Sequence, residues 1–361
     1  MARSGSRAPD AAESHPQERS RYSLAPLRFG IVSDVTHQPI GVTLAPLLAL
    51  GPSTALDVAR AADAAGYDSL WTAEVTGPDA FALLAACSQV APGLGLGTGV
   101  LALQLRTPPL AAMAAATLQA LAPDRDVWLG IGISSPVVAA QWHGAEYGHR
   151  PIAHVIEYIS LVKACLSGER VDFEGDFYRV SRFRLGVRLG ERRPKIVVGA
   201  LNPAMLRAAG RHADGVLLNY LPAHHVGWSV EQVRKGGDAT VFGYVHVGVT
   251  DRASADAAAR ADLFSYAVVD AYAANFTRAG YGDSVDAVRA AHAAKDRDGA
   301  LAAVSDAFID GIDVVGDAQH VRATVDAYRA NGLEYPIIFP LPWGKDRATV
   351  IDATLRAAAP A

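Results

Sequence analysis

Five ionisable side chains follow short apolar runs of the sequence or lie within one: Asp34, His37, Glu74, His143 and His246. Carboxylates at such positions accept hydrogen bonds from a bound ligand, and a histidine exchanges a proton near neutral pH. His143, in a turn between a tryptophan and a glycine, is the first candidate for a catalytic proton donor, and Glu74 and His37 are the other candidate catalytic residues. A single histidine is also often a packing residue, so structural pinning of the turn is the competing interpretation.

A second group of residues could hold a phosphate. It comprises Gly199, Ala200, Leu201 and Asn202. These residues precede a helix predicted to begin at Pro203, and a helix N-terminus offers amide donors and a partial positive charge without any basic side chain. Asn219, at the end of a later run, could add a hydrogen bond. Asn202 as a plain helix cap, with no ligand, explains the same pattern.

Both groups lie at the ends of short runs that alternate with alanine-rich segments. The runs are β-branched or bounded by glycine and predict eight strands: Arg28–Asp34, Tyr67–Glu74, Leu94–Val100, Asp126–Gly132, Lys195–Ala200, Gly215–Asn219, Thr240–Val249 and Tyr335–Phe339. Because the connections are helical, the pattern favours an α/β fold, a (β/α)8 TIM barrel. Such barrels carry their chemistry at the carboxyl ends of the strands, where the candidate residues lie.

The barrel is predicted to occupy residues 26–361 as one catalytic domain, after a disordered tail at residues 1–25 that is rich in Arg, Ser, Pro and Ala. Two insertions are expected. One, at about 168–194 after strand four, contains a β-hairpin, and the other, at about 252–311 after strand seven, is helical. Val35–Pro52 is long and apolar for a loop and is expected to form a wall of the active site.

Composition limits the partners of the 361-residue chain. A formal net charge of -4 argues against binding to nucleic acid or to an anionic membrane, both of which need a dense cationic face. A small-molecule substrate is therefore the expected partner. Cys87 and Cys165 lack metal-ligand spacing and are expected to be reduced core thiols of a cytoplasmic protein, and no metal site is predicted. The first 25 residues contain no apolar stretch typical of a signal sequence or a membrane span.

Several segments, in their order and spacing, resemble the bacterial luciferase-like flavin-dependent oxidoreductases, β/α barrels that use FMN or the deazaflavin coenzyme F420. The matching segments are Ala65–Trp71, Leu96–Val100, Ala115–Leu118 with Asp124 and Arg125, Leu129–Gly132, Glu157–Ile159, Gly175–Tyr178, Pro194–Gly199 and Ala209–Val216. The resemblance covers about Arg28 to Phe339. Ser134–Pro136, Gln141–Gly144 and Ala204–Gly210 resemble the branch that uses F420, with FMN as the alternative cofactor.

The resemblance implies a cofactor site at the strand ends. Deazaflavin members carry a non-prolyl cis peptide where Gly99 and Val100 stand, under the face of the tricyclic ring; an ordinary trans bond is the alternative. After strand four, Gly132 removes a side chain that would keep a planar ring from the backbone, although barrel closure explains it equally well. The remaining residues of the implied cofactor site are Ile133, Ser134, Asp34, Glu74, Gly199, Ala200, Leu201, Asn202 and Asn219. The basic stretch 182–195 could hold the oligoglutamate tail of F420, or be a solvated loop.

Two departures from the family narrow the expected chemistry. The sugar-phosphate and alcohol dehydrogenases of the family have an acidic residue followed by His where this chain has Glu74 and Val75, and a Glu where it has 134–136, Ser-Ser-Pro. Alcohol oxidation is therefore not expected.

The leading hypothesis is an F420-dependent oxidoreductase that transfers hydride between reduced deazaflavin and an electrophilic small molecule of the enone or imine type. An FMN-dependent monooxygenase and a non-catalytic flavin-binding barrel are the alternatives. The resemblance also implies a homodimer.

Overall fold

The computed structural model describes residues 37–344 and 346–360, and residues 38–361 form one compact unit. The predicted tail at residues 1–25, the predicted strand Arg28–Asp34 and the candidate ligand residue Asp34 all lie outside the described residues.

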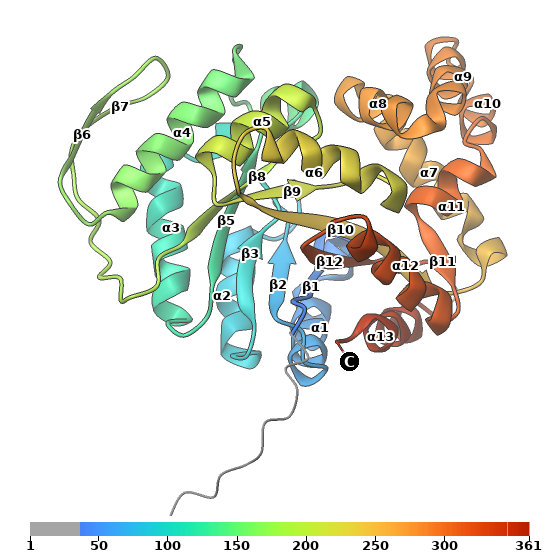
Figure 1. Ribbon diagram of the computed structural model, residues 1–361, viewed down its shortest axis with the longest axis horizontal. Helices are drawn as coiled ribbons and strands as arrows, with labels where there is room; N and C mark the ends of the chain where they lie inside the picture. Colours follow the sequence, from blue (N-terminus) through green and yellow to red (C-terminus); the bar gives the residue numbers. More distant parts are fainter. Residues whose placement is uncertain (1–36, 345, 361) are drawn as a thin grey trace, which may run out of the picture. The chain divides into compact units, whose positions relative to one another are not determined.

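Eight parallel strands close into a barrel, which confirms the predicted fold (Figure 1). The barrel strands are β1 (Gly41–Thr43), β2 (Ser69–Thr72), β3 (Gly95–Thr98), β5 (Val127–Gly132), β8 (Lys195–Gly199), β9 (Gly215–Leu218), β10 (Thr240–Val249) and β12 (Tyr335–Pro340). Each pairs with its neighbour in this order, and β12 pairs with β1 to complete the circle. A two-residue strand, β4 (Leu101–Ala102), continues the line of β3 and pairs with β5.

The predicted position of the first strand is wrong. β1 fills the place between β12 and β2, with Gly41 opposite both Ile337 and Ser69. The segment Val35–Pro52, predicted to be a loop lining the active site, therefore contains a barrel strand and the 3₁₀ helix η1 (Ala45–Leu50). The three residues of β1 include a glycine and give little β signal, so the more β-branched run upstream gives the stronger strand prediction.

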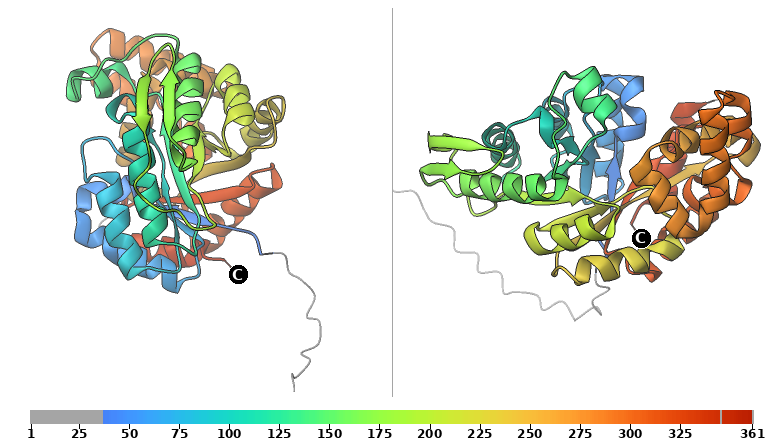
Figure 2. Two further views of the ribbon diagram at one scale, coloured as in Figure 1. Left: turned by 90° about the vertical axis from the view of Figure 1, so that its left-hand side faces the viewer. Right: turned by 90° about the horizontal axis from the view of Figure 1, so that it is seen from above.

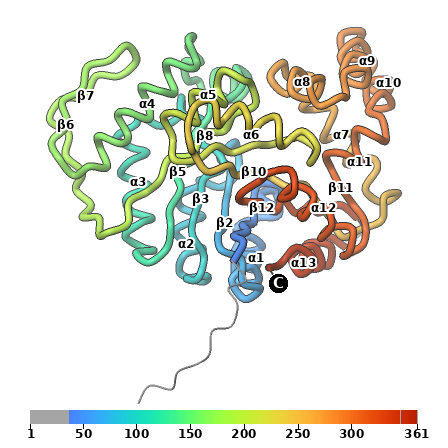
Figure 3. Tube along the Cα trace, viewed as in Figure 1, coloured from blue at the N-terminus to red at the C-terminus, as the bar shows by residue number. Residues whose placement is uncertain are grey.

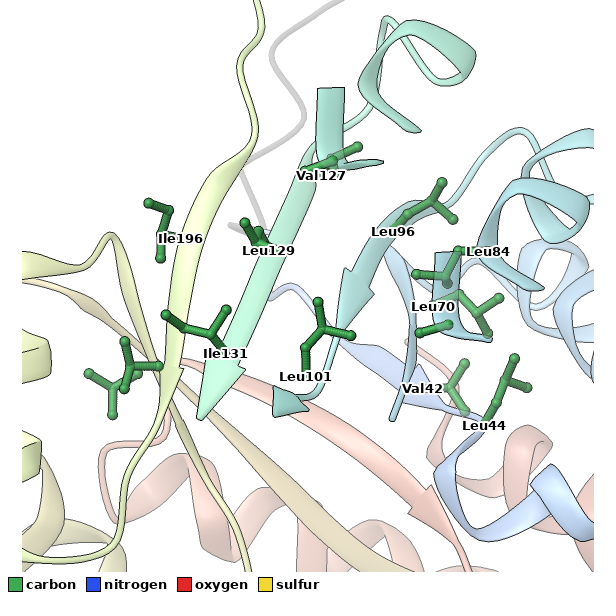
Figure 4. Packing of buried hydrophobic residues seen from close by; sticks show 14 of the residues in the cluster. Val42, Leu44, Leu70, Leu84, Leu96, Leu101, Val127, Leu129, Ile131 and Ile196 are labelled. Carbon is green, nitrogen blue, oxygen red and sulfur yellow. The ribbon is translucent and has the colours of Figure 1, made fainter. Parts of the chain in front are cut away.

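Alternate residues of each strand face two different cores. Outward residues belong to the core between the strands and the surrounding helices, and Figure 4 labels three of them on β5, which are Val127, Leu129 and Ile131. Inward residues fill the barrel, where aromatic rings dominate: Trp71, Trp128, Phe242, Tyr244 and Tyr335. The rings of Trp71 and Trp128 stack with their centroids 5.3 Å apart. The interior below the strand ends is thus a packed core.

The helices that cover the barrel agree with the predicted alternation. They are α1 (Pro52–Ala64), α2 (Ala80–Val90), α3 (Pro108–Leu121), α4 (Pro151–Leu166), α5 (Pro203–His212), α6 (Val226–Arg234), α12 (Ala318–Ala330) and α13 (Arg347–Ala358). The tube in Figure 3 traces their succession around the strands.

Two excursions from the barrel lie at its opposite sides (Figure 2). The first is a hairpin of β6 (Val171–Glu174) and β7 (Arg179–Phe183), beside α4. The Glu157 carboxylate of α4 accepts hydrogen bonds from the backbone amides of Asp176, Phe177 and Tyr178, at 2.8, 2.8 and 2.7 Å, and so anchors the hairpin turn.

The second excursion is helical and follows β10. It comprises α7 (Arg252–Ala267), α8 (Asp270–Phe276), the π-helix η5 (Thr277–Tyr281), α9 (Gly282–Ala293), α10 (Arg297–Ala302) and α11 (Asp306–Ile312). It returns through β11 (Val314–Gly316), which pairs with the upper part of β10. These helices have a hydrophobic core of their own, in which Phe276 and Phe308 are fully buried.

Close backbone approach between β3 and β5 gives the first prediction. A Cβ atom at Gly130 would lie 1.8 Å from the Thr98 carbonyl oxygen, so Gly130→Ala must separate two central strands. We expect it to lower the free energy of unfolding by about 1–3 kcal/mol, measured by urea unfolding. Gly186→Ala is the control, because a Cβ there meets nothing within 4 Å. Equal free energies of unfolding of the two variants would contradict this prediction, because they would show that β3 and β5 separate without loss of stability.

Candidate active site

At the carboxyl end of the barrel, neighbouring strands present inward positions without side chains. Gly99 follows β3, Gly132 ends β5 and Gly199 ends β8. A Cβ at Gly132 would lie 2.9 Å from a methyl group of Val100, and one at Gly199 would lie 3.3 Å from the other methyl group. Val100 therefore sits against bare backbone. We call this part of the barrel mouth the glycine wall (Gly99, Val100, Gly132 and Gly199); Val100 carries its one side chain.

The peptide bond between Gly99 and Val100 is cis, as the resemblance implied. The Gly99 carbonyl oxygen accepts a 2.6 Å hydrogen bond from the Tyr244 hydroxyl, which reaches it from β10 across the barrel. Burial raises the pKa of Tyr244 above its usual range, so the phenol stays protonated and remains a donor. Tyr244 thus ties the glycine wall to the opposite side.

The opposite side of the mouth carries large side chains. His246 of β10 stacks on Phe339 of β12, with ring centroids 4.0 Å apart and planes 6° from parallel. Asn219, directly after β9, accepts a 2.9 Å hydrogen bond at its side-chain oxygen from His246. The mouth is therefore asymmetric, with bare backbone on β3, β5 and β8 and rings on β10 and β12.

The start of α5 differs from a plain capped helix. Asn202 holds the N-cap position, but its side chain makes no capping hydrogen bond. Of the residues before it, Ala200 is buried and uses its amide to donate to the Leu217 carbonyl, whereas the Leu201 carbonyl accepts a 3.0 Å bond from the guanidinium of Arg278 in η5. A cation thus lies beside the helix N-terminus. Sequence reasoning missed Arg278, because it comes from the second excursion.

Glu74 follows β2 and is held by structural partners. Its carboxylate accepts two hydrogen bonds from Arg106, at 3.0 and 2.7 Å, and a third from the Ala80 amide at the start of α2. Only 12% of the Glu74 side chain is exposed. The hydrogen bond to Glu74 raises the pKa of Arg106, so the guanidinium keeps its positive charge. The Glu74 carboxylate joins the loop after β2 to the loop after β4 and has little hydrogen-bonding capacity left for a substrate.

The remaining predicted site residues are His143, Ile133, Ser134 and His37, and each has its own surroundings. His143 follows the short π-helix η3 (Val137–Trp142), and its Nε2 donates to the Val75 carbonyl at 2.6 Å, which leaves Nδ1 for a substrate. Ile133 turns its side chain into the outer core, so only its backbone can face the mouth, whereas Ser134 is half-buried in the loop after β5. His37 comes before β1 in the sequence, and not after the first strand as predicted.

The basic stretch 182–195 does not reach the mouth. Arg192 and Lys195 both form ion pairs with Asp126, at 2.6 and 2.9 Å. Asp126 directly precedes β5 and Lys195 begins β8, so these ion pairs lie at the amino ends of the strands. The hypothesis that they form a cationic rim for a cofactor tail is wrong, because parallel strands separate their two ends across the barrel.

A buried polar cluster lies where β9 and β10 part. The two strands pair from Thr240 opposite Gly215 only up to Gly243 opposite Leu218, and higher up β11 replaces β9 beside β10. The gap is filled by five residues that we call the seam cluster: Asn219, Tyr220, His246, Asp262 and Asp313. Within it, His246 Nδ1 lies 3.0 Å from Asp313 Oδ1, and the Tyr220 hydroxyl donates to Asp262 at 2.8 Å.

Burial controls the charges of the seam cluster. His246 and Asp313 are 2% and 0% exposed, and burial lowers the pKa of His246 to about 4 and raises that of Asp313 well above its usual range. Burial, together with the neighbouring Asp313, raises the pKa of Asp262 to about 7. The side-chain atoms of His246, Asp262 and Asp313 lie within 4.8 Å of one another. Sequence reasoning included His246 but missed both aspartates, which lie in the helical excursion and at its return.

Comparison with known proteins assigns this architecture. The sequence profile described as luciferase-like monooxygenase matches residues 27–335. The chain belongs to this family.

Individual members of the luciferase-like family support the assignment. A Mycobacterium tuberculosis protein, provisionally named a coenzyme F420-dependent oxidoreductase, is 30% identical over 83% of this chain and 94% of its own length. An F420-dependent glucose-6-phosphate dehydrogenase of Nakamurella multipartita is 33% identical over 46% of this chain, which spans about half (52%) of that enzyme. The F420-dependent tetrahydromethanopterin reductase of Methanopyrus kandleri shares the fold, with a TM-score of 0.71 at 18% identity over 90% of this chain and 98% of the reductase.

The expectations about membrane spans and about the two cysteines can be compared with the residues that the structure describes. No helix among them is long and apolar enough to cross a membrane. Cys87 and Cys165 are buried free thiols, as predicted.

The geometry of Glu74 gives a second prediction. Glu74→Gln keeps the shape but replaces a charged acceptor of the Arg106 guanidinium, so we expect a loss of about 1–3 kcal/mol in the free energy of unfolding. Asp57→Asn, which alters an exposed carboxylate paired with Arg60, is the control. Urea unfolding of both variants measures the effect. A Glu74→Gln variant as stable as the wild type would show that the ion pair with Arg106 does not stabilise the loops.

The third prediction concerns pH. In the unfolded chain an aspartate titrates near 3.9, whereas the folded pKa of Asp262 is about 7. The folded state therefore holds a proton that the unfolded chain releases, and stability falls as the pH rises through this window. Asp262→Asn removes that titration. Its Tm relative to the wild type should rise by roughly 2 °C or more between pH 4 and pH 8.

Thermal unfolding of Asp262→Asn is compared with that of Asp310→Asn, an exposed aspartate of α11. A Tm difference between Asp262→Asn and the wild type that stays constant from pH 4 to pH 8 would contradict the raised pKa.

Proposed function

We propose that this chain is an F420-dependent oxidoreductase that transfers hydride between the reduced deazaflavin and an electrophilic small molecule of the enone or imine type. The observation that carries the proposal is the glycine wall, where Gly99, Gly132 and Gly199 bring no side chain to the barrel mouth and Val100 alone adds one. A planar ring can approach a backbone surface closely only where side chains are absent. The similarity to proteins named for F420 supports this cofactor.

The residues present fit such a cofactor. Gly99 and Val100, with Gly132 and the backbone of Ile133 and Ser134, would line the ring. The loop 199–202 would hold the phosphate, because the N-terminus of α5 lacks a side-chain cap and Arg278 adds a positive charge beside it. Asn219 would contribute from the opposite side.

In the proposed reaction, the side chains of the protein orient the reactants and supply a proton. When bound, the reduced deazaflavin supplies a hydride from the ring carbon that replaces a flavin nitrogen, and it does not readily activate oxygen. The hydride adds to the electrophilic carbon of the substrate, and a proton adds to the atom that receives the displaced electron pair. We propose His143 as the donor of this proton: in its imidazolium form Nδ1 carries the proton that is transferred, while the Nε2 hydrogen stays on the Val75 carbonyl.

Glu74 receives no catalytic role in this proposal. Its carboxylate is engaged by Arg106 and by the start of α2, so it would act by holding the loop after β2 at the mouth. The same engagement argues against alcohol oxidation with Glu74 as a base. Reduction of an already electrophilic substrate needs only an acid, which is the role proposed for His143.

An FMN-dependent monooxygenase is the second candidate. It is favoured by the description of the matching family as luciferase-like monooxygenases. The same glycine wall would accommodate the flavin ring, so the cofactor must be decided by binding.

The fourth prediction is therefore a binding experiment. We expect F420 to quench the intrinsic tryptophan fluorescence saturably, with a Kd on the order of 1 µM, and FMN to bind at least roughly tenfold more weakly, a difference of about 1.4 kcal/mol. A matched variant, Gly132→Val, fills the glycine wall and should weaken binding of F420. Saturable binding of FMN with none of F420 would reject the proposal in favour of the second candidate.

A further inference from the structure

The hydrogen bonds of the seam cluster fix the protonation of His246. Asn219 Oδ1 lies 2.9 Å from both the Tyr220 amide nitrogen and His246 Nε2. A backbone amide can only donate, so the atom of Asn219 that faces it is the oxygen. An oxygen accepts, and His246 Nε2 must therefore carry a hydrogen. Nδ1 then faces Asp313 Oδ1 at 3.0 Å.

Between Nδ1 and Oδ1 there must be a proton, because two unprotonated acceptors repel at this distance. The proton belongs to Asp313, since full burial favours a neutral carboxyl group and a neutral imidazole over an ion pair. The Oδ2 atom of Asp313 is buried without a partner among the described residues, which is tolerable for a neutral carboxyl group and costly for an anion. The ionisable groups around the pair include Tyr220, Asp262, Tyr266, Tyr272 and Tyr328.

Asn219 is the part of the seam cluster that reaches the barrel mouth. It is half-buried, whereas His246 and Asp313 are fully buried. Its oxygen accepts from Tyr220 and His246. The Tyr272 hydroxyl of α8 lies near the same side chain and can take at most one of its two amide hydrogens, so at least one hydrogen remains for a ligand.

We propose that Asp313 and His246 are positioning residues for the cofactor: Asp313 donates its proton to Nδ1, and the Nε2 hydrogen of His246 then holds Asn219 in a single orientation for binding. This inference rests on the proposed function, in which Asn219 contacts F420. The aspartate supplied by the return of the helical excursion thus acts on the cofactor through two intermediate side chains. No proton leaves this pair during turnover.

The fifth prediction tests the pair by two measurements. In ¹⁵N NMR of histidine-labelled protein, with the His246 signals assigned by comparison with His246→Gln, we expect the neutral Nε2–H tautomer from pH 5.5 to pH 8.5. By fluorescence titration, Asp313→Ala should weaken F420 binding roughly tenfold, the effect of one lost hydrogen bond. Asp313→Asn, whose amide can donate to Nδ1, should stay within about twofold of the wild type.

Asp310→Asn, three residues away on the exposed face of α11, is the control and should bind F420 as the wild type does. Dissociation constants are measured on the folded fraction, determined by circular dichroism. A purely structural role would lower the stability of Asp313→Ala and leave its affinity unchanged, which would overturn the proposal.

An imidazolium signal or an Nδ1–H signal for His246 would overturn it as well. So would a stoichiometric divalent metal ion that is present in the purified wild type and lost from Asp313→Ala, because a cation would then lie where we place the proton. If the wild type does not bind F420, the proposed function fails, and the role toward that cofactor fails with it; the NMR measurement still decides whether Asp313 holds the tautomer.

Discussion

The absence of side chains at the carboxyl ends of β3, β5 and β8 is the constraint on which the site depends. Val100 can lie against Gly132 and Gly199 only because neither has a Cβ atom. Tyr244 then reaches across the barrel to the Gly99 carbonyl. The interior of the barrel below the mouth is filled with packed aromatic rings. The outer core that supports the same strands is shown in Figure 4. A planar ligand can lie close to backbone only where side chains are absent.

The two sides of the mouth are stabilised by different interactions. The glycine wall depends on close backbone contacts, in which a single added carbon collides with a neighbouring strand or side chain. The side formed by β9 and β10 depends on buried polar groups, which are stable only when their hydrogen bonds are satisfied and their charges are suppressed. Asn219 and His246 connect the second side to the helical excursion, so the excursion contributes to the site without necessarily lining it.

Sequence reasoning predicted the barrel well because strand and helix periodicity repeats around it. It failed at β1, whose three residues give little local signal and whose place is decided by pairing with Ile337 and Ser69. Glu74 is a candidate catalytic and cofactor-binding residue from sequence because it stands at a strand end, whereas its bidentate partner Arg106 lies 32 residues away. Asp262 and Asp313 could not be linked to His246 from the sequence, since only the parting of β9 and β10 brings them together.

The helical excursion leaves the barrel after β10 and returns through β11, which forms a parallel pair with the same strand: Val247 lies opposite Val314, and Val249 opposite Gly316. Its entry and exit are therefore neighbours, one strand spacing of about 4.8 Å apart. A segment whose ends meet in this way can be exchanged for another of different length without altering the register of the barrel. Residues 252–312 can thus vary in length and sequence while the eight strands of the barrel stay in register.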